Sequence, residues 1–269
     1  MKQYYFISGL PRSGSTLLSA ILKQNPEFYA DIASPVEALT GSSIDIITQN
    51  EVNLIVAEKQ RKNLLHGIFD GYYQHIENPT IFDSSRSWTK KTNLLHALFS
   101  YTKILCPVRD IISILNSFEV LLNKNCFYTK QISEKVFSDN IFKRTQEIFE
   151  REVIKYHSFL QEGYLLNPEM IYFIKYENLC KEPEKTMRGV YEFLEKPYYS
   201  HDFRNVKYSN ENFDKSCNLK DLHTVRKAVK YKPPRIILPS QIVQKYKKMN
   251  MEFWDDDNKN ILNEFIEYK

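Results

Sequence analysis

The sequence predicts an α/β fold of three layers, in which helices flank both faces of a central, mostly parallel sheet. Apolar runs of strand length alternate with longer segments whose apolar residues recur at helical spacing, an order typical of parallel sheets with right-handed crossovers. Three of the runs end in polar residues, and ligands of such sheets bind beyond the carboxyl ends of the strands. A chain of 269 residues is long enough for one such domain. We therefore expect a single domain over residues 1–269.

Charge and composition exclude several classes of protein. The 37 basic and 33 acidic residues give a net charge of +4, which is too balanced for a protein whose main partner is nucleic acid. No apolar run approaches the length of a membrane span, and the residues before Gly9 leave no room for a signal peptide. Cys106, Cys126, Cys180 and Cys217 show no metal-ligand spacing, so we expect buried free thiols and no metal site. These features predict a cytoplasmic protein with no membrane or nucleic-acid partner.

The first predicted strand covers residues 4–7, where Tyr-Tyr-Phe-Ile forms the continuous apolar run expected of a strand buried on both faces. Gly9 and Gly14 bracket the polar loop that follows, and a helical pattern begins at Ser15 and Thr16. The spacing is G-x-x-x-x-G. However, Ser15 stands where the Walker A lysine would bind the β and γ phosphates of a nucleoside triphosphate.

This loop is expected to bind an anionic group even without that lysine. The first N–H groups of a helix have no partner within the helix, and the helix N-terminus carries a partial positive charge. Arg12 adds a planar cation, and the hydroxyls of Ser13, Ser15 and Thr16 can donate hydrogen bonds to oxygens on phosphorus or sulfur. We therefore predict an anion site here and not an ordinary strand-to-helix turn.

The remaining elements follow from the period of the apolar residues and from the turn residues between them. They are an irregular or short extended segment (28–35), two or three helices (37–75), a strand (80–82), a helix (92–99), a strand (103–108), a helix (111–122), one long helix or two (134–166), a strand (170–176), a helix (184–194) and two closing helices (240–246 and 258–268).

Polar residues after three of these strands are expected to meet the loop at one edge of the sheet. They are the cluster 83–88, Arg109 and Tyr176. Ser117 follows Arg109 by eight residues, which is about two helical turns. The two side chains can therefore approach one phosphate only if Arg109 lies in the loop before the helix.

Together these blocks resemble the sulfotransferases that use 3'-phosphoadenosine 5'-phosphosulfate (PAPS), a family with a P-loop-like fold. Residues 9–17, G-L-P-R-S-G-S-T-L, resemble the family's 5'-phosphosulfate loop, especially the P-R-S-G-T-T-L of its protein-tyrosine and bacterial branches. Residues 108–117 resemble its 3'-phosphate site, an arginine followed eight residues later by a serine. Residues 176–183 are similar to its Y-E-D-L-x-x-x-P segment, whose tyrosine lies near the adenine in relatives. The match runs over about residues 5–183.

The resemblance implies an enzyme that moves a sulfonate group from PAPS to a hydroxyl or amine acceptor by in-line displacement without a metal. The product would be adenosine 3',5'-bisphosphate (PAP). Arg12 would stabilise the leaving group and so act in catalysis. The cofactor-binding residues that the resemblance implies are Arg12, Ser13, Gly14, Ser15, Thr16, Leu17, Arg109, Ser117 and Tyr176. It also implies Arg226 and Lys227, because segment 222–227 stands where relatives carry a basic, glycine-rich segment that covers the 3'-phosphate.

The resemblance leaves the catalytic base and the acceptor open. Aligned on Pro26, the glutamate base of the protein-tyrosine branch falls on Ile32. We favour the nearby Glu37 as the base, with Asp83 and His66 in reserve. The acceptor is a small molecule, a glycan or a protein tyrosine, and segments 37–80 and 198–235 are expected to cover the acceptor and the cofactor.

Two other functions fit parts of the pattern. A P-loop kinase using ATP and magnesium would need a lysine at position 15, although Asp83 could serve as its magnesium ligand. A nucleotide-binding module of the same fold would have kept the anion site and lost the base.

Overall fold

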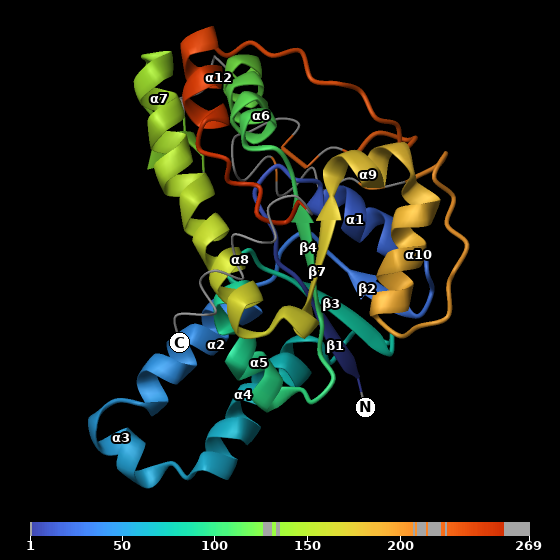
Figure 1. Cartoon of the computed structure of the whole chain (residues 1–269). Coiled ribbons are helices and arrows are strands. Elements are labelled where there is room, and N and C mark those ends of the chain that lie inside the picture. Colours follow the sequence, from blue (N-terminus) through green and yellow to red (C-terminus); the bar gives the residue numbers. More distant parts are fainter. Residues whose placement is uncertain are drawn as a thin grey trace.

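The computed structural model has the predicted α/β architecture, with a central sheet whose described strands are all parallel. The structure describes residues 2–125, 131–132, 135–206, 208, 214, 222–223 and 225–255. The sheet has the strand order β2-β3-β1-β4-β7, and helices lie on both of its faces (Figure 1). Its strands are β1 (Gln3–Ile7), β2 (Phe28–Ala30), β3 (Thr80–Ser84), β4 (Ile104–Val108) and β7 (Ile171–Lys175).

The helices lie in the segments where the apolar residues recur at helical spacing. They are α1 (Ser15–Leu22), α2 (Val36–Ile47), α3 (Asn50–Ile55), α4 (Glu58–Tyr72), α5 (Thr92–Leu98), α6 (Ile111–Lys124), α7 (Ile141–Ile148), α8 (Ile154–Leu166), α9 (Tyr176–Lys181), α10 (Pro183–Phe193) and α12 (Ser240–Lys247). A π-helical turn, η2 (Phe149–Val153), joins α7 to α8, and two 3-10 turns are η1 (Trp88–Lys91) and η3 (Pro168–Met170). Strands β5 (Gln131–Ile132) and β6 (Lys135–Val136) form a separate antiparallel pair.

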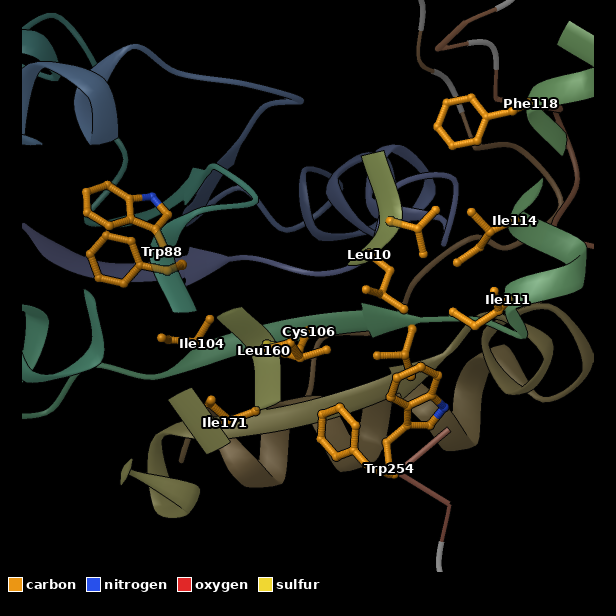
Figure 2. Packing of buried hydrophobic residues seen from close by; sticks show 14 of the residues in the cluster. Leu10, Trp88, Ile104, Cys106, Ile111, Ile114, Phe118, Leu160, Ile171 and Trp254 are labelled. Carbon is orange, nitrogen blue, oxygen red and sulfur yellow. The ribbon is translucent and has the colours of Figure 1, made fainter. Parts of the chain in front are cut away.

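Alternate residues of β1 enter two different cores, as expected for a strand buried on both faces. Tyr5 and Ile7 pack into the cluster formed with α1, α9 and α10. Tyr4 and Phe6 pack into the larger cluster, which includes side chains of α4, α5, α6 and α8. In Figure 2 this larger cluster brings Leu10, just beyond β1, together with Ile111 and Ile114 of α6. The apolar face of α6 therefore holds that helix beside the loop after β1.

The strand order creates a crevice beside β1. From β1 the chain passes through α1 to β2 and then to β3, which pairs with one edge of β1, whereas β4 pairs with the other edge. The loops after β1 and β4 therefore leave neighbouring strands in different directions. In open parallel sheets this switch point is where ligands bind.

Most element predictions are confirmed. The exceptions are helix α9, which was not predicted, and strand β6, which lies in the segment 134–166 that was predicted as helical. The region 37–75 holds three helices, with breaks at residues 48–49 and 56–57. Strand β7 ends at Lys175 because its neighbour β4 ends opposite it at Val108, and Tyr176 opens a helix and does not belong to the strand. The predicted closing helix 258–268 lies outside the described residues.

Two further sequence predictions are tested only where the structure describes the chain. Cys106 and Cys180 are buried free thiols, as expected, whereas Cys126 and Cys217 lie outside the described residues. Over the described ranges, no helix combines enough length with enough apolar character to pass through a lipid bilayer.

Candidate active site

The loop after β1 lies so close to the end of β4 that its first glycine has no room for a side chain. A Cβ atom on Gly9 would lie 2.2 Å from the carbonyl oxygen of Pro107. The same carbonyl accepts hydrogen bonds from the N–H of Leu10 at 2.9 Å and from the hydroxyl of Ser13 at 2.8 Å. Ser13 is fully buried. Its hydroxyl, predicted as a ligand group, therefore fixes the loop to β4.

Arg12 forms the turn of the loop and has left-handed backbone geometry, with φ of 57°. Its Nε donates a hydrogen bond to Ser117 Oγ at 3.1 Å, and its Nη1 donates to the carbonyl oxygen of Leu222 at 2.6 Å. Burial, followed by the positive charges of Arg109 and Arg86, lowers the pKa of Arg12 to about 10. The side chain thus stays charged at neutral pH, and an anion beside it would relieve the repulsion between the cations.

The N-terminus of α1 lies next to Arg12 and has amide donors that no hydrogen bond within the helix uses. Its N-cap residue, Gly14, provides no side-chain cap, and the first intrahelical hydrogen bond runs from Leu18 N–H to the Gly14 carbonyl at 2.9 Å. The amides of Ser15, Thr16 and Leu17 therefore have no partner within the helix. Such an N-terminus favours an anion through its amides and its dipole.

Gly14 is covered by the ring of Tyr176, the first residue of α9. The backbone of Gly14 has φ of 93°, and a Cβ atom there would lie 2.7 Å from Tyr176 Cδ2. The guanidinium carbon of Arg109 lies 4.3 Å from the centroid of the same ring. Tyr176 therefore connects the loop after β1 to the loop after β4 by direct packing.

Arg109 lies in the loop before α6, as the sequence required for it to share a phosphate with Ser117. Its Nη1 donates to the carbonyl oxygen of Arg12 at 3.1 Å. Its Nε is buried, finds no hydrogen-bond acceptor among the described residues, and lies 3.7 Å from Glu177 Oε1. A buried donor without an acceptor is costly, so this atom fits a site that an anionic ligand would complete.

A segment from the C-terminal part of the chain crosses over the loop. We call its described residues, 222–223 and 225–230, the strap. It is irregular and is fastened to an earlier segment by two backbone hydrogen bonds, from Val206 N–H to the Lys227 carbonyl at 2.7 Å and from Val229 N–H to the Phe203 carbonyl at 2.8 Å. The strap thus closes one side of the site.

These parts enclose a cavity of about 290 Å³. It is lined by Arg12, Gly14, Thr16, Leu17, Arg109, Ser117, Tyr176, Cys180, Leu222, His223, Val225, Arg226, Ala228, Val229 and Lys230. Eight residues of the predicted set, from four separate parts of the chain, are thus brought together. Three others lie elsewhere: Ser13 is buried beneath the loop, Ser15 does not line the cavity, and Lys227 is exposed and contributes a carbonyl to the strap.

The three candidate bases do not line this cavity. The carboxylate of Glu37 forms an ion pair with Lys91 Nζ at 2.7 Å and lies 4.0 Å from Lys90 Nζ. His66 packs edge-on against the ring of Phe99, with centroids 4.9 Å apart, and Phe99 precedes β4 at the opposite end of the strands from the loop.

Asp83 is the last residue but one of β3, at the same edge of the sheet as the loop, but its carboxylate is fully buried. It accepts hydrogen bonds from Ser34 Oγ at 2.5 Å, Tyr73 OH at 2.7 Å and Trp88 Nε1 at 2.6 Å. Burial raises the pKa of Asp83, although the three hydrogen bonds oppose that shift. This carboxylate organises the residues around it.

One cavity residue, His223, and its partner Asp214 were not singled out from the sequence. His223 Nδ1 lies 2.7 Å from Asp214 Oδ1, and the backbone N–H of His223 donates to Asp214 Oδ2 at 3.1 Å. The two residues belong to a stretch without helical or strand period, so no spacing rule pairs them. The one sequence signal that could have pointed to His223 was the presence of a histidine within a basic segment.

Comparisons with known proteins identify the family of the chain and agree with its fold. A model of the sulfotransferase family matches residues 5–200. The solved sulfotransferase domain from the curacin biosynthetic pathway is 18% identical, covering 93% of this chain and 97% of that one with a TM-score of 0.53. A mouse sulfotransferase solved with PAP is 12% identical, covering 98% of this chain and 89% of that one with a TM-score of 0.51. The sulfotransferase from Alicyclobacillus acidocaldarius is 15% identical, with coverages of 80% and 90% and a TM-score of 0.51. No curated protein sequence matches the chain.

Proposed function

This chain belongs to the sulfotransferase family, and we propose that it moves a sulfonate group from PAPS to a hydroxyl or amine acceptor and releases PAP. The observation that carries the proposal is the cavity in which Arg12, Arg109 and the N-terminus of α1 converge. These groups are separated in the sequence and share a preference for anions. Two cationic side chains beside one helix N-terminus suit a ligand with two anionic groups.

The cavity residues divide between the two ends of such a ligand. Arg12, Thr16 and the free amides of α1 would hold the 5'-phosphosulfate. Arg109 would hold the 3'-phosphate with Ser117, since both line the cavity and Arg109 Nε lacks a hydrogen-bond acceptor among the described residues. Tyr176 would pack against the adenine. Arg226 of the strap adds a further cation to this wall.

The chemistry that PAPS supplies is an activated sulfonate whose transfer leaves PAP. The protein has to position the acceptor and to stabilise the negative charge that develops on the leaving 5'-phosphate oxygens. Arg12 meets the second need because it stays charged and is held in place by Ser117 and the Leu222 carbonyl. The strap would exclude water, which strengthens this electrostatic effect.

The kinase alternative is weaker. Ser15 replaces the lysine that a Walker A loop uses. Asp83, the candidate magnesium ligand, already accepts hydrogen bonds from Ser34, Tyr73 and Trp88. Its carboxylate would have to give up these donors before it could bind a metal ion.

Three assignments beyond the chemistry are part of the proposal. We propose one domain in which residues 198–235 cover the cofactor and residues 37–80 shape the acceptor pocket. The role of 198–235 is supported by the strap residues that line the cavity. The acceptor is left as a hydroxyl or amine compound. We also propose a cytoplasmic location, because buried free thiols at Cys106 and Cys180 suit a reducing compartment.

The proposal is tested by ligand-induced stabilisation and by sulfonate transfer. PAP without magnesium should raise the melting temperature, whereas ATP with magnesium should not. Radiolabelled PAPS should transfer its sulfonate to acceptors in a fractionated extract of the host cells. Arg12→Ala should reduce this transfer at least ~100-fold with little change in melting temperature.

A matched control for Arg12→Ala is Arg188→Ala. Arg188 lies on α10 and pairs with Glu184 at 2.7 Å on the exposed surface, so its loss should leave transfer unchanged. Stabilisation by ATP and magnesium alone would favour the kinase. Stabilisation by PAP without any transfer would favour the binding module.

A further inference from the structure

The proposed reaction needs a group that removes the acceptor proton, and the structure offers one in the cavity itself. We propose that His223 is the general base of this sulfonate transfer and that Asp214 is its positioning residue. This inference rests on the proposed function and replaces Glu37 as the base. It is carried by the geometry of the pair and by its place beside Arg12.

Asp214 holds His223 at two points. Its Oδ1 lies 2.7 Å from the imidazole Nδ1, and its Oδ2 accepts the backbone N–H of His223 at 3.1 Å. An ionised carboxylate accepts hydrogen bonds and does not donate them. The contact therefore places the imidazole proton on Nδ1 and makes Nε2 the proton-accepting nitrogen. A base oriented by a third group in this way is a recurrent arrangement in enzymes.

His223 lies close to the residue that is proposed to stabilise the leaving group. His223 lines the same cavity as Arg12, and Arg12 Nη1 donates to the carbonyl oxygen of the preceding residue, Leu222, at 2.6 Å. The base and the cation proposed to stabilise the leaving group are thus connected through one residue. Sulfur would lie between the acceptor and the leaving oxygen, so both groups have to border one small space.

Burial and the neighbouring arginines favour the neutral imidazole of His223, the form that a base requires. Burial lowers the pKa of His223, Asp214 raises it, and the positive charges of Arg12 and Arg86 lower it. Arg226 lies in the same cavity and adds a further positive charge there. The neutral ring can accept a proton, and Asp214 then stabilises the imidazolium that forms.

The proton and electron balance of the step is simple. The acceptor O–H or N–H gives its proton to His223 Nε2 as the acceptor atom forms a bond to sulfur. The bond between sulfur and the bridging 5'-phosphate oxygen breaks, and its electron pair stays with PAP. His223 afterwards releases the proton to solvent, so no oxidant, reductant or metal is required.

The other candidate bases have different neighbours. Glu37 forms an ion pair with Lys91, and it does not line the cavity. Asp83 is buried among three donors, and His66 packs on Phe99. Among the described residues that line the cavity, His223 is the one histidine, and Asp214 is its carboxylate partner.

The test compares His223→Gln, Asp214→Asn and Glu37→Gln in the extract assay with radiolabelled PAPS. His96→Gln is the matched control, because His96 is an exposed histidine on α5. His223→Gln should lower the transfer rate about 100-fold or more, whereas His96→Gln should stay within about threefold of wild type. Glu37→Gln should lower the rate far less than His223→Gln. PAP should stabilise all four variants as much as it stabilises wild type.

The pH profile separates a base from a structural residue. The wild-type rate should fall at low pH as His223 becomes protonated, and this acid limb should disappear in the residual activity of His223→Gln. Asp214→Asn should shift the limb to lower pH, since the carboxylate raises the pKa of His223. An acid limb that persists in His223→Gln, or one that disappears in Glu37→Gln, would overturn the assignment. Loss of PAP stabilisation in step with activity would also overturn it. A wild-type protein that PAP does not stabilise would instead refute the proposed function, and the base with it.

Discussion

Replacing Gly14 with alanine tests how tightly the loop after β1 is built. The substitution adds one methyl group at the N-cap of α1, where φ is 93° and Tyr176 Cδ2 would lie 2.7 Å from the new carbon. Carbon atoms in contact are normally about 3.5–4.0 Å apart, so the ring has to retreat by about 0.8 Å. Arg109 lies on that ring with its guanidinium carbon 4.3 Å from the centroid. The displacement therefore reaches the proposed 3'-phosphate site as well.

Two costs add up in this variant. A left-handed backbone costs a non-glycine residue about 1–2 kcal/mol, and overpacking costs typically about 1–3 kcal/mol. The free energy of unfolding of Gly14→Ala should thus fall by about 2–5 kcal/mol. Displacement of the tyrosine and of Arg109 should weaken PAP binding at least ~10-fold, which corresponds to about 1.4 kcal/mol.

The measurements are chemical denaturation and PAP titration, with Gly67→Ala as the matched control. Gly67 lies within α4, and a Cβ atom there meets nothing within 4 Å. This control should gain about 0.5–1 kcal/mol of stability and keep its PAP affinity. Part of the stability loss comes from the clash between the new methyl group and the Tyr176 ring. Adding Tyr176→Ala to Gly14→Ala should remove this clash, and a double-mutant cycle would measure its energy. If Gly14→Ala retained wild-type stability and PAP affinity within twofold, the proposed tight packing would be refuted.

Two further predictions follow from single contacts. Arg109→Ala should weaken PAP binding by about 10–100-fold, because a hydrogen bond to a charged group contributes about 1.5–3 kcal/mol. It should change the affinity for adenosine 5'-phosphosulfate far less, and equal losses in titrations of both ligands would contradict a 3'-phosphate role. His157 is buried with Nε2 2.7 Å from the Met251 carbonyl oxygen, and burial lowers its pKa. The pKa of His157 in the folded protein thus lies below its unfolded value of about 6.5. The neutral, buried imidazole therefore contributes its full share to the free energy of unfolding above about pH 6.5, and this share is lost as the pH falls. Melting temperatures measured from pH 8 to pH 5 should decline less steeply in His157→Gln, and an unchanged slope would contradict this.

The elements that could be predicted were those with strong local patterns. The apolar run before Gly9 and the helical spacing after Ser15 identify strand, loop and helix without any other part of the chain. The position of Arg109 could also be reasoned out, because two helical turns separate it from Ser117. The structure places Arg109 before α6 and both side chains at one cavity.

Exposure of individual hydroxyls could not be predicted from spacing. Ser13 and Thr16 looked equivalent as donors, yet Ser13 is buried against Pro107 whereas Thr16 lines the cavity. The difference arises from the close approach of the loop to β4, which no local pattern describes. Glu37 shows the same limit, because its ion pair with Lys91 joins residues that are distant in sequence.

The sequence by itself determined the fold class, the family and the anionic character of the ligand, since these depend on short-range periodicity and on residue types within single blocks. Only the tertiary structure decided which cavity residues face one another. Arg12 meets the carbonyl of Leu222 across a sequence separation of 210 residues, and His223 meets Asp214 within a stretch that has no period. Packing of distant segments fixes such contacts, because it selects one arrangement from the many that the local sequence permits.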